Sequence, residues 1–65
     1  MDTDDRIDYA ERQCRASNLT SAQTAQVLAY LLGAILTHFD STPVIPLTDT
    51  RWFRLVDSAI HDATT

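Results

Sequence analysis

The sequence predicts an all-α fold: a small chain of three helices, at about residues 4–17, 21–39 and 49–63, that forms a helical-bundle homodimer around its second helix. Three observations lead to this expectation. Three segments with helical patterns are separated by only two short breaks, and capping signals mark where the second and third begin. The middle segment carries no charged residue, and the two outer helices offer too little apolar surface to cover it.

The length of the chain sets the first limits. Residues 1–65 make one helical domain, with residues 1–3 and 64–65 expected to fray. A domain this small buries only about 60% of the surface that its unfolded chain exposes, so a single core contributes only roughly 3 to 5 kcal/mol of stability. Because Cys14 is the only cysteine, no intrachain disulfide adds to this. A second copy of the chain is then the expected source of further stability, with an intermolecular Cys14 disulfide as the minor alternative.

The first predicted helix, at about residues 4–17, is stabilised mainly by its charges. Acidic residues lie in its first turn and arginines near its end, which suits the helix dipole. Asp8 with Arg12, and Glu11 with Arg15, form i,i+4 pairs worth about 0.3 kcal/mol each. Its apolar face is thin and consists of Ile7, Ala10 and Cys14, flanked by Tyr9. This helix therefore needs a partner surface to be stable.

The boundaries of the second helix are marked by capping and breaking residues. Asn18 is a suitable left-handed stop for the first helix. The sequence TSAQ, from Thr20 to Gln23, has the form of a capping box and predicts a start directly after Thr20. The helix runs to about Phe39, since proline at position 43 disfavours helical geometry in the residue before it.

The charge-free segment from Leu19 to Phe39 is not expected to cross a membrane. Its low-polarity run, Ala25 to Leu36, spans only about 18 Å, whereas the hydrocarbon core of a bilayer is about 30 Å thick. Flanking lysine and arginine residues are also missing. The segment is instead expected to be a soluble helix that is covered on most faces.

Small residues on the second helix indicate a close helix crossing. Ala25, Ala29, Gly33 and Thr37 recur every four residues, and glycine inside a helix costs about 1 kcal/mol relative to alanine. Either another helix of the same chain or the second helix of a second copy crosses there. Two neighbouring helices leave part of this helix uncovered, and a symmetric dimer would close that surface. The predicted dimer interface consists of Ala25, Leu28, Ala29, Leu32, Gly33 and Leu36.

The third helix follows a connection with two prolines, Pro43 and Pro46, which predicts an extended strap lying on hydrophobic surface. Thr48 is the expected N-cap, with Leu47 and Trp52 spaced for a hydrophobic staple. The buried stripe of this helix is expected to consist of Trp52, Val56 and Ile60, joined by Phe53, Leu55 and Ala59.

The titratable residues do not indicate an enzyme, and we expect no cofactor and no metal. His38, His61 and Cys14 lie in different segments, with no nucleophile and base at a spacing that requires proximity. No pair of potential ligands has the spacing of a zinc site. The single glycine, Gly33, also excludes a glycine-rich phosphate-binding loop.

Charge argues against nucleic acid as the partner. The formal net charge is -4, lysine is missing, and every arginine has an acidic residue nearby, so no basic stripe forms. The sequence RWFR, at residues 51–54, is more typical of protein recognition, because tryptophan and arginine are enriched at binding hot spots. Alternatively, Trp52 and Phe53 anchor the third helix in the core. The candidate partner-binding residues are Arg51, Trp52, Arg54 and Tyr9.

These observations predict a non-enzymatic protein-binding module: a small acidic homodimer that docks on a larger protein and modulates or inhibits it. By association alone, such chains are common among regulators encoded by phages and mobile elements. The acidic N-terminus does not resemble a secretory signal, and a lone cysteine suits a reducing compartment, so we expect a cytoplasmic protein. The alternatives are a structural subunit or assembly factor of a heteromeric complex and, with less weight, a nucleic-acid-associated regulator.

Overall fold

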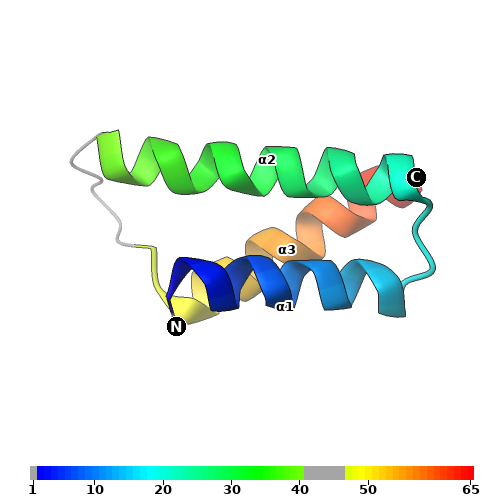
Figure 1. The fold of residues 1–65 in the computed structure, drawn as a ribbon, viewed down its shortest axis with the longest axis horizontal. Helices are drawn as coiled ribbons and strands as arrows, with labels where there is room; N and C mark the ends of the chain where they lie inside the picture. The colour runs from blue at the N-terminus through cyan, green and yellow to red at the C-terminus, as the bar shows by residue number, and fades with distance from the viewer. Residues whose placement is uncertain (1, 41–46) are drawn as a thin grey trace.

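The computed structural model describes residues 2–40 and 47–65, except for the side chains of residues 38–40. Over this part of the chain the fold is all-α, with helices α1 (Thr3–Ala16), α2 (Ser21–Asp40) and α3 (Asp49–Thr64). The first two helices run antiparallel, and α3 crosses obliquely from the start of α1 to the start of α2 (Figure 1). The all-α, three-helix prediction is confirmed. The predicted strap lies largely within residues 41–46, outside the described part.

Side-chain caps explain where the helices begin. An Asp2 carboxylate oxygen accepts a hydrogen bond from the Asp5 amide at 2.9 Å, so α1 starts at Thr3, in the segment that was expected to fray. The hydroxyl of Thr48 accepts from the Arg51 amide at 3.2 Å and starts α3, as predicted. Asn18 has a φ of 60°, which confirms the left-handed stop after α1.

The capping box at the start of α2 is also confirmed. The Thr20 hydroxyl accepts from the Gln23 amide at 3.1 Å, and the Gln23 side-chain oxygen accepts from the Thr20 amide at 2.9 Å. The two residues therefore satisfy two amides that the helix itself leaves without partners. The helix ends at Asp40, one residue beyond the expected end.

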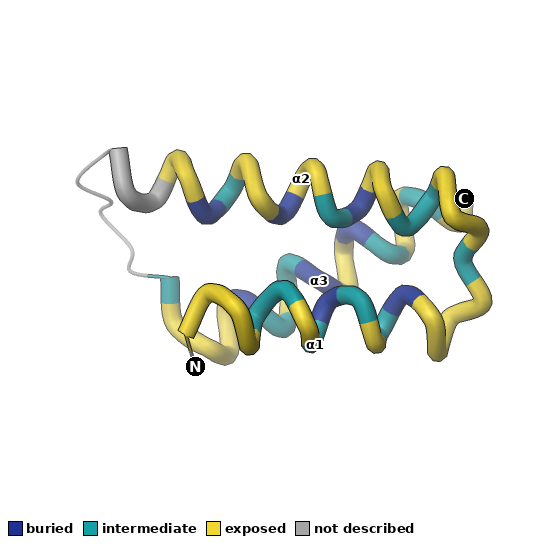
Figure 2. The backbone as a smooth tube through the Cα atoms, viewed as in Figure 1, coloured by how far each residue is buried: buried dark blue, intermediate teal, exposed yellow. Residues whose placement is uncertain are grey.

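The core lies where the three helices face one another. Each pair of helices is in contact, and the buried positions of all three point toward the centre (Figure 2). In the thin stripe of α1, Ala10 and Cys14 are completely buried and Ile7 is half-buried against the core, and Trp52 and Val56 of α3 are completely buried. The eight buried apolar residues among those described are Ala10, Cys14, Val27, Leu31, Ile35, Trp52, Val56 and Ala59.

Coverage of α2 is more one-sided than expected. Val27, Leu31 and Ile35 face the core, whereas Leu32 and Leu36 are exposed. A β-carbon built on Gly33 would meet nothing within 4 Å, so neither α1 nor α3 crosses there. The small residues of α2 were explained by a close crossing either of another helix of the same chain or of a second copy. The space around Gly33 excludes a close crossing by the described part of the same chain. Among the described helices, none combines the length and the apolar character needed to traverse a lipid bilayer.

Candidate interaction surfaces

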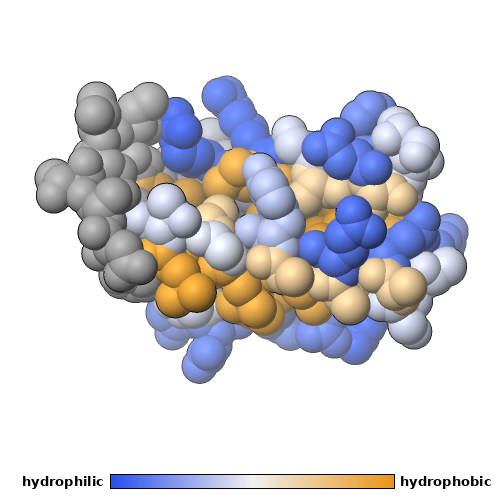
Figure 3. Space-filling model, turned by 90° about the horizontal axis from the view of Figure 1, so that it is seen from above, coloured by the Kyte–Doolittle hydropathy of each residue, from blue (hydrophilic) through white to orange (hydrophobic). Residues whose placement is uncertain are grey.

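An uncovered strip of α2 is the first candidate surface. We call it the apolar face of α2 and define it by five residues: Ala25, Ala29, Leu32, Gly33 and Leu36. All five are exposed, with fractions of 43% for Leu32 and 62% for Leu36. The view onto α2 shows hydrophobic residues gathered in a band along this side, with hydrophilic residues at its margins (Figure 3).

The apolar face contains every residue of the predicted dimer interface except Leu28. That side chain is half-buried and packs against the core cluster, so it borders the face from the α1 side. Thr37 borders the face, and its hydroxyl donates a hydrogen bond to the Gly33 carbonyl at 2.9 Å. The five residues of the strip itself carry no charge and no polar side-chain group. That a second copy covers it stays a prediction.

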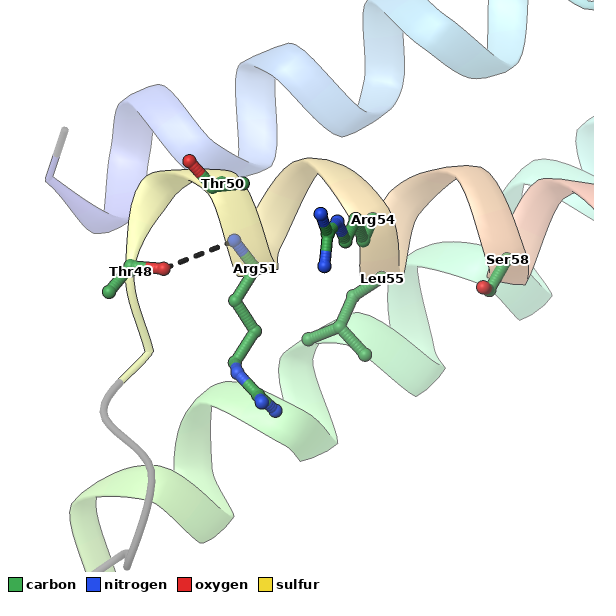
Figure 4. A pocket seen from close by; sticks show the side chains of 6 residues that line it. All are labelled: Thr48, Thr50, Arg51, Arg54, Leu55 and Ser58. Atoms are coloured by element: carbon green, nitrogen blue, oxygen red, sulfur yellow. Dashed lines mark hydrogen bonds between the residues drawn. The ribbon is translucent and has the colours of Figure 1, made fainter.

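A groove along α3 is the second candidate surface. We call it the basic groove; it is lined by Thr48, Thr50, Arg51, Arg54, Leu55 and Ser58 and encloses about 290 Å³. Figure 4 shows Arg51, Leu55 and Ser58 following one another along one side of α3, with the Arg54 guanidinium turned back toward Arg51. Both arginines are exposed. Within the described residues, neither guanidinium has an ion pair, so two cations stay available in a chain with a net charge of -4.

The other two predicted partner-binding residues are not part of this groove. Trp52 is completely buried, so its interpretation as a partner contact is wrong and the alternative, a core anchor, is confirmed. Tyr9 is half-buried and packs its ring on Phe53, with the ring centroids 4.7 Å apart. The structure therefore brings Arg51 and Arg54 together and leaves Tyr9 on the contact between α1 and α3.

Arg6 is a structurally important residue that the sequence reasoning missed. Its guanidinium donates to the Leu47 carbonyl at 2.9 Å and forms an ion pair with Asp49 at 3.3 Å. The same group lies 6.0 Å from the centroid of the Trp52 ring. The side chain is only 16% exposed. A signal was present, because Arg6 lies one helical step of four residues before Ala10 and thus continues the buried stripe of α1.

Cys14 and the acidic residues form neither a reactive thiol site nor a metal site in the described part of the chain. The thiol is completely buried, and this burial, together with the nearby Glu11 carboxylate, raises the pKa of Cys14. A thiol in this state is a poor nucleophile at neutral pH. Across residues 2–40 and 47–65, no three histidine, cysteine or acidic side chains are grouped so that they would hold a metal ion.

Over the described residues, the fold and its two surfaces define a class of protein: a small all-α chain with an apolar helix face that the other helices leave exposed and a separate groove with two arginines that have no ion pair. Comparison of the chain with protein-family models, with curated proteins and with solved structures found no match. The function must therefore be inferred from these surfaces alone.

Proposed function

We propose that this chain is a non-enzymatic protein-binding module that forms a homodimer through the apolar face of α2. In this proposal the dimer works in the cytoplasm, where it docks on a larger protein through the basic groove and modulates or inhibits it. Self-association and docking then use different surfaces. A dimer would therefore still present two basic grooves to its target.

The observation that carries the proposal is the exposure of Leu32 and Leu36 on a strip without charge. Complete burial of a leucine side chain is worth roughly 1.5 to 3 kcal/mol, so leaving two of them in water forgoes much of that gain. For a chain whose single core supplies only roughly 3 to 5 kcal/mol, this is a large fraction of the available stability. Covering the strip with a second copy would recover it.

The basic groove supports the docking part of the proposal. Arg51 and Arg54 flank the apolar side chain of Leu55, and within the described residues neither guanidinium is neutralised by an ion pair. Arginine beside apolar surface is a common composition of binding hot spots. The groove would suit a segment of a target protein that combines carboxylates with an apolar side chain.

Affinity capture from the native host tests the docking part. The wild-type chain should recover one larger protein in stoichiometric amount, and the Arg51→Ala/Arg54→Ala variant should lose it while remaining dimeric. Arg12→Ala serves as the control, because it also removes an exposed arginine but lies on α1, away from the groove and from the residues that border the apolar face. Equal recovery by the double variant and by this control would contradict docking through the groove.

The same preparation separates the alternatives. A chain that is molten or insoluble when purified alone, and that folds only with a heterologous protein, would be a structural subunit or assembly factor. Binding to duplex DNA with an affinity that falls steeply as salt rises would instead indicate a nucleic-acid-associated regulator.

A further inference from the structure

The spacing of the exposed apolar residues on α2 is that of a helix-pairing seam. Ala25, Ala29, Leu32 and Leu36 follow one another in steps of four, three and four residues. This alternation places apolar side chains along one line of a helix and is the pattern by which two helices pack side by side. The buried stripe of Val27, Leu31 and Ile35 lies on another side of α2, so this seam is additional to the core.

The size of these side chains changes along the seam. Its N-terminal half carries the alanines at positions 25 and 29, and its C-terminal half carries the leucines at 32 and 36. In a parallel pair, alanine would face alanine and leucine would face leucine, which leaves gaps at one end and crowding at the other. In an antiparallel pair, each alanine faces a leucine, which fills the space evenly as close packing requires.

From this pattern we infer that two copies of the chain pair antiparallel through the apolar face of α2. Ala25 of one copy lies opposite Leu36 of the other, and Ala29 lies opposite Leu32. Both contacts are symmetric about the point between residues 30 and 31, so a single two-fold axis passes there. This inference rests on the proposed function, since it specifies the register of the proposed homodimer.

The charges on α1 favour the same arrangement. A two-fold axis perpendicular to α2 keeps the α1 helices of both copies on one side of the interface and runs them in opposite directions. Each α1 begins with Asp4 and Asp5 in its first turn and carries Arg15 in its last. Arg15, which forms an ion pair with Glu11, lines a hollow together with Glu11, Ala25 and Leu28. The C-terminal end of α1, where Arg12 and Arg15 outnumber Glu11, therefore borders the face. The basic end of one copy would therefore approach the acidic end of the other.

A parallel dimer lacks this charge complementarity. Its two-fold axis would run along α2 and place the two α1 helices on opposite sides of the interface, where their charges would not meet. The seam itself carries no charge, so it offers nothing that would select a charged partner in place of a second copy. Size and charge thus point independently to an antiparallel pair.

Disulfide trapping tests the register in a Cys14→Ala background whose helical content is first verified by circular dichroism. Ala25→Cys and Leu36→Cys are prepared as separate chains with different tags, then mixed under mild oxidation. The mixture should form the mixed disulfide roughly tenfold faster than either chain forms a disulfide with itself, because pairing raises the effective concentration only of the opposed thiols. Ser17→Cys, at an exposed site off the face, gives the background rate.

Efficient formation of an Ala25→Cys disulfide with itself would overturn the antiparallel register. If sedimentation still showed a dimer in that case, the proposed function would survive. If the wild-type chain stayed monomeric at millimolar concentration and no cysteine pair exceeded the Ser17→Cys background, the homodimer itself would be wrong.

An exchange of side-chain sizes gives a second readout without oxidation. Ala25→Leu alone should crowd the interface and Leu36→Ala alone should leave a gap, so each should weaken dimerisation. The double variant Ala25→Leu/Leu36→Ala restores one large and one small side chain at each antiparallel contact and should recover dimerisation. Additive weakening in the double variant would contradict the register.

Discussion

Arg6 and Trp52 contact each other through two separate interactions, which join α1 to α3. The indole nitrogen of Trp52 donates to the Arg6 carbonyl at 3.2 Å, and the Arg6 guanidinium lies 6.0 Å from the centroid of the Trp52 ring. The same guanidinium donates to the Leu47 carbonyl just before α3. One long side chain therefore closes the end of the core at which α1 and α3 begin.

Replacing Arg6 by alanine should lower the free energy of unfolding by about 1 to 2 kcal/mol, because a largely buried hydrogen bond and the packing of the side-chain stem are lost. Urea denaturation at fixed protein concentration, followed by the fluorescence of the single tryptophan, measures this. Arg12→Ala is the matched control on the same helix. Its ion pair with Asp8 is exposed, so less than about 0.5 kcal/mol should be lost. Equal losses would contradict the role of Arg6.

Gln23 combines the capping box with a long-range hydrogen bond, in which its side-chain nitrogen donates to the Ala63 carbonyl at 2.9 Å. Gln23→Glu keeps an acceptor for the Thr20 amide but removes that donor. We therefore expect faster hydrogen exchange in the last turn of α3 and a loss of about 1 kcal/mol. Thr20→Ala should cost about as much by weakening the cap, but exchange should then increase at the start of α2. If Gln23→Glu left the last turn of α3 unchanged, the tie between the two helices would be unimportant.

Leu31 and Leu32 are neighbours in the sequence with opposite environments, since Leu31 is completely buried and Leu32 is exposed. Leu31→Asp should abolish the cooperative thermal transition, because it places an unpaired charge in the core. Leu32→Asp should leave the monomer helical but weaken dimerisation by roughly a hundredfold or more, about 3 kcal/mol. Circular dichroism and sedimentation together distinguish the two. An unfolded Leu32→Asp monomer would show that the face is part of the core.

Cys14 should make stability depend on pH in the alkaline range. Burial raises the pKa of this thiol above its usual value of 9.0, with a further increase from Glu11. The folded chain therefore keeps its proton at pH values where the unfolded chain loses it. The stability that the protonated Cys14 thiol contributes is complete below the pKa of this thiol in the unfolded chain. It declines as the pH rises from that pKa toward the higher pKa of the folded chain. Between pH 8 and about 9.5 the midpoint urea concentration should fall in the wild type and stay flatter in Cys14→Ala. If the midpoint fell equally with pH in the wild type and in Cys14→Ala, the thiol would not be the source of the pH dependence.

Much of the local structure was predictable from the sequence. The capping box at Thr20 and Gln23, the Thr48 cap and the ion pairs of α1 join residues at most four positions apart, and the left-handed stop is a property of Asn18 alone. The fixed geometry of one helical turn determines whether such residues meet. The candidate site was predictable only in part: Arg51 and Arg54 share a groove, but Trp52 does not belong to it.

By itself, then, the sequence determined the three helices, the starts of the second and third, and the apolar residues from which a core is chosen. The tertiary structure alone decided which stripe of α2 that core uses, which of the two roles predicted for Trp52 holds, and that Arg6 reaches α3. The physical reason is that α2 offers more apolar surface than two short helices cover, so several stripes compete for burial. The packing of all three helices selects Val27, Leu31 and Ile35 and leaves Leu32 and Leu36 exposed.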